Sequence, residues 1–124
     1  NRELAEINEH ALVDYLEQLH QDDFIRKVEK AIAELLPSGD ISDDKVADAL
    51  FMSTRTLQRR LSVEGLTYKQ ILESVRHTLA EQYIRDERLS LNEISYLLGF
   101  SEQSSFSRAF KRWTGKSPSE ARRE

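Results

Sequence analysis

An internal repeat limits the folds that are open to this chain of 124 residues. Residues 46–53 and residues 94–101 align at an offset of 48, with apolar side chains at matching places and a serine at the end of each segment. The second copy then contains one additional residue, after which Phe106 and Phe110 correspond to Leu57 and Leu61 of the first copy. Each copy therefore predicts a short helix, a tight turn and a second helix that is opened by a serine cap.

The local signals predict an all-α protein. No segment alternates apolar and polar residues as a strand would, and single glycines and prolines separate short helical patterns. The longest predicted helix runs from Thr67 to about Asp86, and another runs from Asp22 to Leu36. Three residue pairs match the capping box, in which two side chains satisfy each other's free backbone N–H groups. These pairs are Thr67 with Gln70, Ser90 with Glu93, and Ser117 with Glu120.

The first residues of the chain predict an additional amphipathic helix, because apolar side chains recur there at three- and four-residue steps. This helix could pack within the chain, pack on a domain outside it, or mediate self-association. We favour packing within the chain, since amphipathic helices usually contribute to a core. The stripe consists of Leu4, Ile7, Leu12, Tyr15, Leu16 and Leu19.

The composition argues against several functional classes. The chain contains no cysteine, which excludes disulfides, thiolate metal sites and thiol nucleophiles. Its histidines, His10, His20 and His77, lack the spacing of a helical metal site, and no glycine-rich phosphate loop occurs. No apolar run approaches the roughly 18 residues of a membrane span, and no signal peptide is evident. We therefore expect a cytoplasmic protein without catalytic activity, metal or cofactor.

The charge is divided unevenly along the chain. A formal net charge of −4 argues against nucleic-acid binding, since such domains are usually basic. Residues 1–44 hold four basic and twelve acidic side chains, however, whereas residues 45–124 hold 14 basic and 10 acidic ones. The basic excess thus coincides with the repeat, and such asymmetry points to nucleic acid.

The second helix of each copy presents a polar face opposite its buried apolar pair. In the first copy this face carries Arg55, Gln58 and Arg59. Arginine can bond bidentately to guanine, glutamine to adenine, and serine to either bases or phosphates. The corresponding face of the second copy carries Gln103, Ser104, Ser107, Arg108 and Lys111.

Taken singly, each of these side chains is more commonly an ordinary solvated surface residue. Their repetition on two units, without a carboxylate among them, favours DNA binding. A helix of about 20 residues between the units would span about 30 Å. Successive major grooves on one face of B-DNA are about 34 Å apart. We therefore predict that the two second helices enter adjacent major grooves.

Residues 94–123 carry many characteristic side chains at fixed spacings, namely Ile94, Gly99-Phe100-Ser101, Phe106, Arg108, Phe110-Lys111, Gly115, Ser117-Pro118 and Arg122. In these positions the segment resembles the C-terminal DNA-binding domain of AraC/XylS-type bacterial transcription regulators, and the resemblance extends more loosely back to about Asp22. It implies two helix-turn-helix units joined by a linker helix, which bind double-stranded promoter DNA. It also implies RNA polymerase as a partner, and a sensor domain with its own effector that precedes this chain.

The resemblance also implies a division of the chain and a set of base-reading positions. The expected DNA-binding domain covers residues 22–124 and follows the extra N-terminal helix of residues 1–21. Its parts are a first unit (22–66), a linker helix (67–87) and a second unit (88–124). The base-reading positions of the family fall on Arg55, Gln58, Arg59, Gln103, Ser104, Ser107 and Arg108.

Three residues depart from the pattern of the family. Phe51 stands where the second copy has Gly99. Because a bulky residue at positive φ is costly, we expect a different turn or a tilted helix in the first unit. Ala121 replaces a frequent aromatic residue and Ser95 a small apolar one, changes that affect the packing and not the fold.

The rival hypothesis is a helical protein-interaction module that binds no DNA, which the acidic, apolar-striped N-terminal segment favours. Salt distinguishes the two, since DNA binding weakens steeply with added salt and an apolar groove does not. Trp113 and Phe110 resemble stacking residues, but their position after the polar face predicts core packing instead. Phe106 is predicted to fill the core of the second unit.

Overall fold

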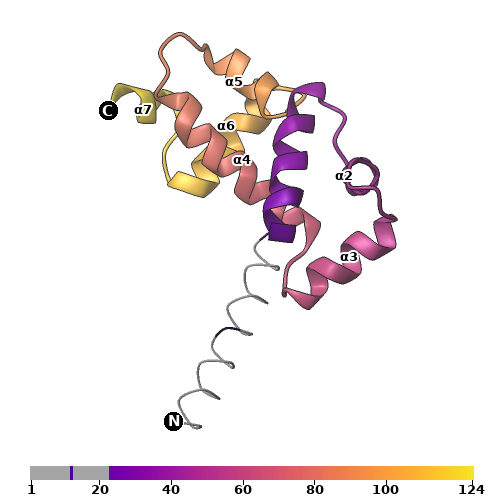
Figure 1. Cartoon of the computed structure of the whole chain (residues 1–124). Coiled ribbons are helices and arrows are strands. Elements are labelled where there is room, and N and C mark those ends of the chain that lie inside the picture. Colours follow the sequence, from indigo (N-terminus) through magenta and orange to yellow (C-terminus); the bar gives the residue numbers. More distant parts are fainter. Residues whose placement is uncertain (1–11, 13–22) are drawn as a thin grey trace, which may run out of the picture.

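The computed structural model describes Leu12 and residues 23–124, and this part of the chain is helical with no strand. The prediction for residues 1–21 lies outside the described residues, apart from the single position 12. Figure 1 shows the arrangement of the helices. They are a helix over residues 23–35, the 3₁₀ helix η1 (Leu36–Ser38), α2 (Asp43–Ala49), α3 (Thr54–Val63), α4 (Tyr68–Ile84), α5 (Leu91–Leu97), α6 (Gln103–Thr114) and α7 (Pro118–Arg123).

Side-chain caps determine where α4 and α5 begin. Thr67 Oγ1 accepts the backbone N–H of Gln70 at 3.2 Å, and Gln70 Oε1 accepts the N–H of Thr67 at 2.9 Å. Ser90 and Glu93 exchange the same two bonds at 3.0 and 3.2 Å. Because these bonds satisfy backbone donors that a helix start leaves free, both predicted capping boxes are confirmed.

Two other predicted caps are wrong in part, although α7 begins after Ser117 as predicted. Ser117 accepts the N–H of Glu120 at 3.2 Å, but its hydroxyl donates to the carboxylate of Glu120 in place of the predicted return bond. The predicted serine cap of the second helix occurs only in the first unit, where Ser53 accepts a backbone N–H at 3.1 Å. In the second unit the N-cap is Glu102, which makes no side-chain cap bond. The additional residue after Ser101 moves the helix start past that serine.

One apolar core packs on the first half of α4, and a second, separate core packs on its second half. The first is enclosed by the helix over residues 23–35, η1, α2 and α3, and the second by α5 and α6. The side chains buried in the first core are Phe24, Val28, Ala31, Ile32, Leu36, Val46, Ala47, Leu57, Leu61, Ile71 and Val75. Those of the second are Ala80, Ile84, Ile94, Leu98, Phe106 and Phe110.

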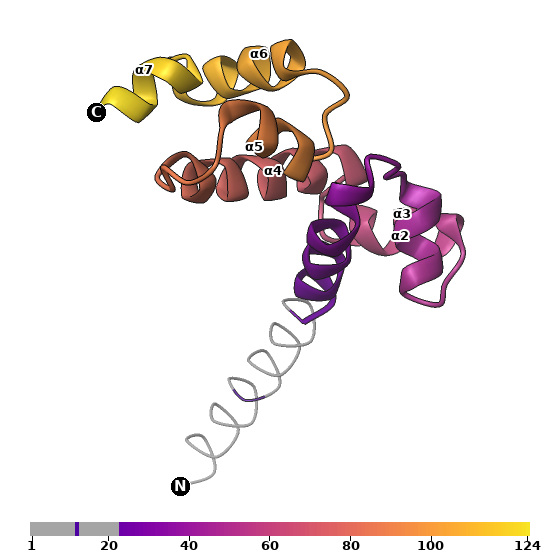
Figure 2. The same cartoon turned by 90° about the horizontal axis from the view of Figure 1, so that it is seen from above.

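Helix α4 belongs to both cores, which makes it the predicted linker helix. Ile71 and Val75 from its first half are buried in the first core, Ala80 and Ile84 from its second half are buried in the second, and Leu79 packs against both. In Figure 2, α5 and α6 lie along α4, whereas α2 and α3 lie near its N-terminal end. The fold is therefore the predicted pair of helix-turn-helix units on a shared helix.

The turns of the two units have the same backbone conformation, although one contains a phenylalanine and the other a glycine. Phe51 has φ 58° and Gly99 has φ 78°, both in the left-handed region. The N–H of Met52 bonds to Ala47 O at 3.0 Å, and the matching bond at the offset of 48 is also 3.0 Å long. The expected difference between the turns is wrong, because Phe51 is 97% exposed and its bulk is accommodated in solvent.

Polar side chains fasten the second unit together. The guanidinium of Arg122 donates to the backbone oxygen of Ile84, at the C-terminal end of α4, at 3.2 Å and to that of Leu89, in the loop before α5, at 2.6 Å. The last carbonyls of a helix have no partner within it, so a cation at Ile84 satisfies one of them and complements the dipole of α4. Buried Ser95 donates to the backbone oxygen of Glu102 at 3.2 Å and thereby ties α5 to the start of α6.

Candidate nucleic-acid interface

The predicted DNA-reading face of α3 is open to solvent. Leu57 and Leu61 are fully buried, while Arg55, Gln58 and Arg59 are exposed. In a helix with 3.6 residues per turn, residues two positions apart point to opposite sides. Arg55 and Arg59 each lie two positions from Leu57, and Gln58 lies one position from it, so none of them shares the buried side. The structure thus brings the three polar residues together on the outer side of one helix.

The polar face of α6 is arranged in the same way. Phe106 is fully buried and Phe110 is 2% exposed, which confirms both as core residues. Ser107 is half-buried, because it lies at the border between the apolar and the polar side of the helix. The remaining predicted residues are exposed, namely Gln103, Ser104, Arg108 and Lys111.

Two acidic side chains of α2 reach the polar face of α3. The amide nitrogen of Gln58 donates to Asp43 Oδ2 at 3.0 Å, and Thr54 Oγ1 donates to Asp44 Oδ1 at 2.5 Å. Both aspartates stand in the first turn of α2, where negative charge is favourable. The amide of Gln58 must therefore exchange its bond to Asp43 before it can donate to an adenine. Sequence reasoning missed these two aspartates as neighbours of the polar face of α3.

The first turn of α6 has a carboxylate of its own. Ser104 Oγ donates to Glu102 Oε2 at 3.3 Å, and an Arg108 nitrogen lies 3.5 Å from Ser105 Oγ. Weak bonds between exposed groups exchange readily with water, since their net contribution is about 1 kcal/mol or less. The Arg108 guanidinium therefore remains available for a partner outside the chain.

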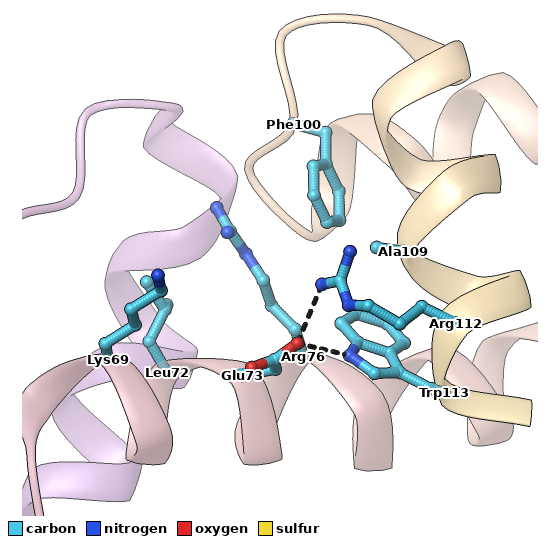
Figure 3. Close-up of a pocket in the computed structure, with 8 residues that line it drawn as sticks. All are labelled: Lys69, Leu72, Glu73, Arg76, Phe100, Ala109, Arg112 and Trp113. Carbon is cyan, nitrogen blue, oxygen red and sulfur yellow. Dashed lines mark hydrogen bonds and ion pairs between the residues drawn. The ribbon is translucent and has the colours of Figure 1, made fainter.

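A cleft of about 340 Å³ lies between α4 and α6 (Figure 3). Its walls combine aromatic and aliphatic side chains with three cations and one carboxylate. Arg112, in this wall, stands four residues after Arg108, so the cleft borders the polar face of α6. The lining residues are Lys69, Leu72, Glu73, Arg76, Phe100, Ala109, Arg112 and Trp113.

Glu73 is held by two donors from α6, as the dashed lines in Figure 3 mark. An Arg112 nitrogen lies 2.7 Å from Glu73 Oε1, and the indole N–H of Trp113 donates to the same oxygen at 2.8 Å. The bond from Arg112, and next that from Trp113, hold the pKa of Glu73 below its usual range. Glu73 thus stays ionised and partly neutralises the basic cleft.

Sequence reasoning missed the three cations of this cleft, Lys69, Arg76 and Arg112. The four-residue step from Arg108 to Arg112 was a signal that Arg112 lies beside the polar face of α6. Its salt bridge to Glu73 could not be predicted, because the two residues are 39 positions apart in the sequence. Trp113 is only half-buried, with its ring stacked on His77 at a centroid distance of 5.3 Å. The prediction of Trp113 as core is therefore confirmed only in part.

The linker helix is shorter than predicted. Helix α4 contains 17 residues, from Tyr68 to Ile84. At 1.5 Å per residue it spans about 25 Å, compared with the predicted length of about 30 Å. Loops and the width of the units must supply the rest of the distance if the two polar faces are to lie one DNA turn apart.

Among residues 23–124 and position 12, no group of three or more histidine or acidic side chains is arranged to hold a metal ion. Within the same part of the chain, no helix is both long and apolar enough to cross a membrane.

Comparison with known proteins places residues 46–124 in a family described as a helix-turn-helix domain. The ornithine utilization regulator of Pseudomonas aeruginosa is 44% identical over 103 residues, which cover 82% of this chain and 30% of the regulator. The chain therefore spans under a third of the length of this curated relative.

Solved structures of transcription regulators resemble the fold. The regulator CdpR from Pseudomonas aeruginosa aligns with a TM-score of 0.62 and 44% identity, covering 68% of this chain and 27% of CdpR. The DNA-binding domain of AdpA, a global transcriptional factor solved in complex with a target DNA, aligns with a TM-score of 0.66 and 26% identity. That alignment covers 79% of this chain and 88% of the AdpA domain.

Proposed function

We propose, from the premise that this chain belongs to the AraC-type helix-turn-helix family, that it is the DNA-binding domain of a bacterial transcription regulator. It binds double-stranded DNA sequence-specifically and inserts α3 and α6 into successive major grooves. The observation that carries the proposal is the repeated unit itself. Each copy buries an apolar pair and exposes a polar face without a carboxylate at the predicted reading positions.

Each reading residue has a chemical role in this proposal. Arg59 and Arg108 are the candidates for bidentate bonds to guanine O6 and N7. Gln58 and Gln103 are the candidates for adenine, Arg55 is a further candidate for guanine, and Lys111 is the candidate for a phosphate contact. The proposed role of Ser104 and Ser107 is to bond bases or phosphates beside these contacts.

The proposal extends to partners outside the chain. Since this chain spans under a third of a relative named as a regulator, the remainder of such a protein is the proposed place of a sensor domain with its effector. The DNA partner is promoter DNA in the bacterial cytoplasm, and RNA polymerase is the proposed protein partner. The domain division into residues 1–21, 22–66, 67–87 and 88–124 belongs to the same proposal. We assign no catalytic activity and no cofactor to this domain.

Selection from a random pool of DNA duplexes tests the proposal directly. We expect the chain to enrich sequences with two conserved segments whose centres lie about 10 base pairs apart, which is one helical turn. Enrichment of a single segment would contradict the insertion of both helices. Failure to enrich any sequence would contradict sequence-specific binding.

Salt dependence of the same complexes separates DNA binding from the rival hypothesis of a protein-interaction module. The logarithm of the binding constant should fall with the logarithm of the salt concentration, with a slope of about −0.9 per neutralised phosphate. Arg112→Gln should reduce that slope by about 1 if its side chain meets a phosphate beside α6. A slope near zero for the parent chain would favour an apolar interface instead.

A further inference from the structure

The turn of the second unit rests on the backbone of the first unit. A Cβ atom added at Gly99 would lie 2.7 Å from the backbone oxygen of Leu36, which belongs to η1. Real Cβ atoms essentially never come this close to another heavy atom. Helix α5, which ends at this turn, also contacts η1. The absence of a side chain at Gly99 therefore allows the two units to touch directly.

Arg76 fastens the same turn to the linker helix. Its Nε donates to Leu98 O at 2.8 Å, and a terminal nitrogen donates to Gly99 O at 3.2 Å. Its guanidinium carbon lies 4.4 Å from the ring centroid of Phe100. Hydrogen bonds from an ionised donor are about twice as strong as neutral ones, and a cation above an aromatic ring adds to them.

We propose that Leu36, Arg76 and Gly99 form a joint that fixes the orientation of α3 relative to α6, and that this joint sets which spacing of DNA half-sites the chain accepts. Without it, the two cores would be connected mainly through α4, and a single helix can bend. This inference rests on the proposed function, because the spacing has meaning only for a protein that reads two half-sites.

The physical gain from such a joint is pre-organisation. Once one helix has bound its half-site, the second binds as an intramolecular event whose effective concentration depends on the geometry of the connection. A fixed joint concentrates the second helix at one spacing and disfavours others. Loss of the joint should therefore weaken binding to paired half-sites while binding to a single half-site persists.

The chain offers a matched control for a test at Gly99. Gly115 also has a left-handed backbone, with φ 82° compared with 78°, so alanine introduces similar backbone strain at both positions. A Cβ atom at Gly115 meets nothing within 4 Å, whereas one at Gly99 meets the Leu36 carbonyl. Gly99→Ala and Gly115→Ala thus differ in the contact across the joint. Arg76→Gln loosens the joint without changing a glycine.

The first experiment measures the joint without DNA. Because the chain has no cysteine, Ser62→Cys on α3 and Ser119→Cys on α7, both exposed, allow two spin labels to be attached selectively. Electron paramagnetic resonance should give a narrow distance distribution for the parent and Gly115→Ala. It should be broader or displaced for Gly99→Ala and Arg76→Gln. Identical distributions in all four proteins would overturn the proposal.

The second experiment uses duplexes from the selection, with paired half-sites at the selected spacing, with one base pair inserted, or with one half-site scrambled. We expect Gly99→Ala and Arg76→Gln to bind the paired duplex about tenfold more weakly than the parent, because the effective concentration of the second helix falls. On the duplex with one scrambled half-site, their affinity should equal that of Gly115→Ala. The inserted base pair should weaken the parent more than these variants. Equal spacing preference in all proteins would overturn the proposal.

The two experiments separate this inference from the proposed function. If the parent binds no duplex, the proposed function fails, and the label distances still decide whether the joint fixes the orientation. If the parent binds paired half-sites and the variants behave like Gly115→Ala in both measurements, the proposed role of the joint is wrong while the proposed function stands. Circular dichroism verifies that each variant is folded, and Arg76→Gln carries the test if Gly99→Ala does not fold.

Discussion

In the first helix-turn-helix unit the turn residue Phe51 is 97% exposed, whereas in the second unit Gly99 lies against the carbonyl of Leu36. Both residues have the left-handed backbone that glycine adopts most easily. The difference shows that the turn conformation alone does not demand glycine here. The contact between the units demands glycine at the second turn, because any side chain there would collide with η1.

The starts of α3 and α6 also differ between the two units. In the first unit Ser53 caps α3, while in the second unit Glu102 precedes α6 and provides no cap bond. Yet α6 is the longer of the two helices, with 12 residues compared with 10. Its stability therefore comes from packing, in which a phenylalanine pair replaces the leucine pair of α3.

The largest expected effect concerns these two apolar pairs. Phe106→Ala should lower the free energy of unfolding by about 3–5 kcal/mol, and Leu57→Ala by about 2–5 kcal/mol, because both side chains are fully buried. Urea denaturation measures both. Tyr96→Ala, at a position that is 66% exposed, is the control and should change little. A loss for Phe106→Ala no greater than that of the control would show that the packing of α6 is misplaced.

The caps should produce a smaller difference. Ser53→Ala removes a bond to a free backbone N–H and should cost about 1 kcal/mol of stability. Ser101→Ala, at the matching serine of the second unit, should change stability by less than about 0.5 kcal/mol, since the structure gives that serine no capping role. Thermal denaturation of both variants makes the comparison. An equal loss in both would mean that Ser101 caps α6 after all.

The smallest effect is expected at the exposed turn. Phe51→Gly relieves a left-handed conformation that costs a residue with a side chain about 1–2 kcal/mol. The greater freedom of glycine in the unfolded chain offsets about 0.5–1 kcal/mol of this gain. A net stabilisation of about 0.5 kcal/mol should therefore appear in denaturant unfolding. A clear destabilisation would mean that the Phe51 ring makes contacts that its exposure does not indicate.

Much of the fold could be predicted from local sequence signals. Capping pairs act within three residues, so Thr67 with Gln70 and Ser90 with Glu93 can be recognised without tertiary information. The repeat adds the pairing of helices, because matching apolar spacing implies matching buried faces. Arg59 and Arg108 lie on exposed faces for the same reason, since a helix that buries one side displays the other.

The remaining features depend on contacts between distant residues. The bond of Arg112 to Glu73 and the approach of Gly99 to Leu36 join segments that no local pattern relates. The direction of the Phe51 side chain was equally unpredictable, because the penalty for positive φ does not state whether the ring points into the core or into solvent. The start of α6 shifted because one additional residue separates Ser101 from the helix.

Footprinting of a selected duplex with wild-type and variant chains tests the central claim most directly. We expect two protected segments about 10 base pairs apart, one for each recognition helix. Arg59→Ala should relax the sequence preference in one segment and Arg108→Ala in the other, each at a cost of about 1–3 kcal/mol in binding. Arg88→Ala, at an exposed arginine that pairs with Asp86 after α4, should leave both segments unchanged. A single protected segment, or two arginine variants that affect the same segment, would contradict the account.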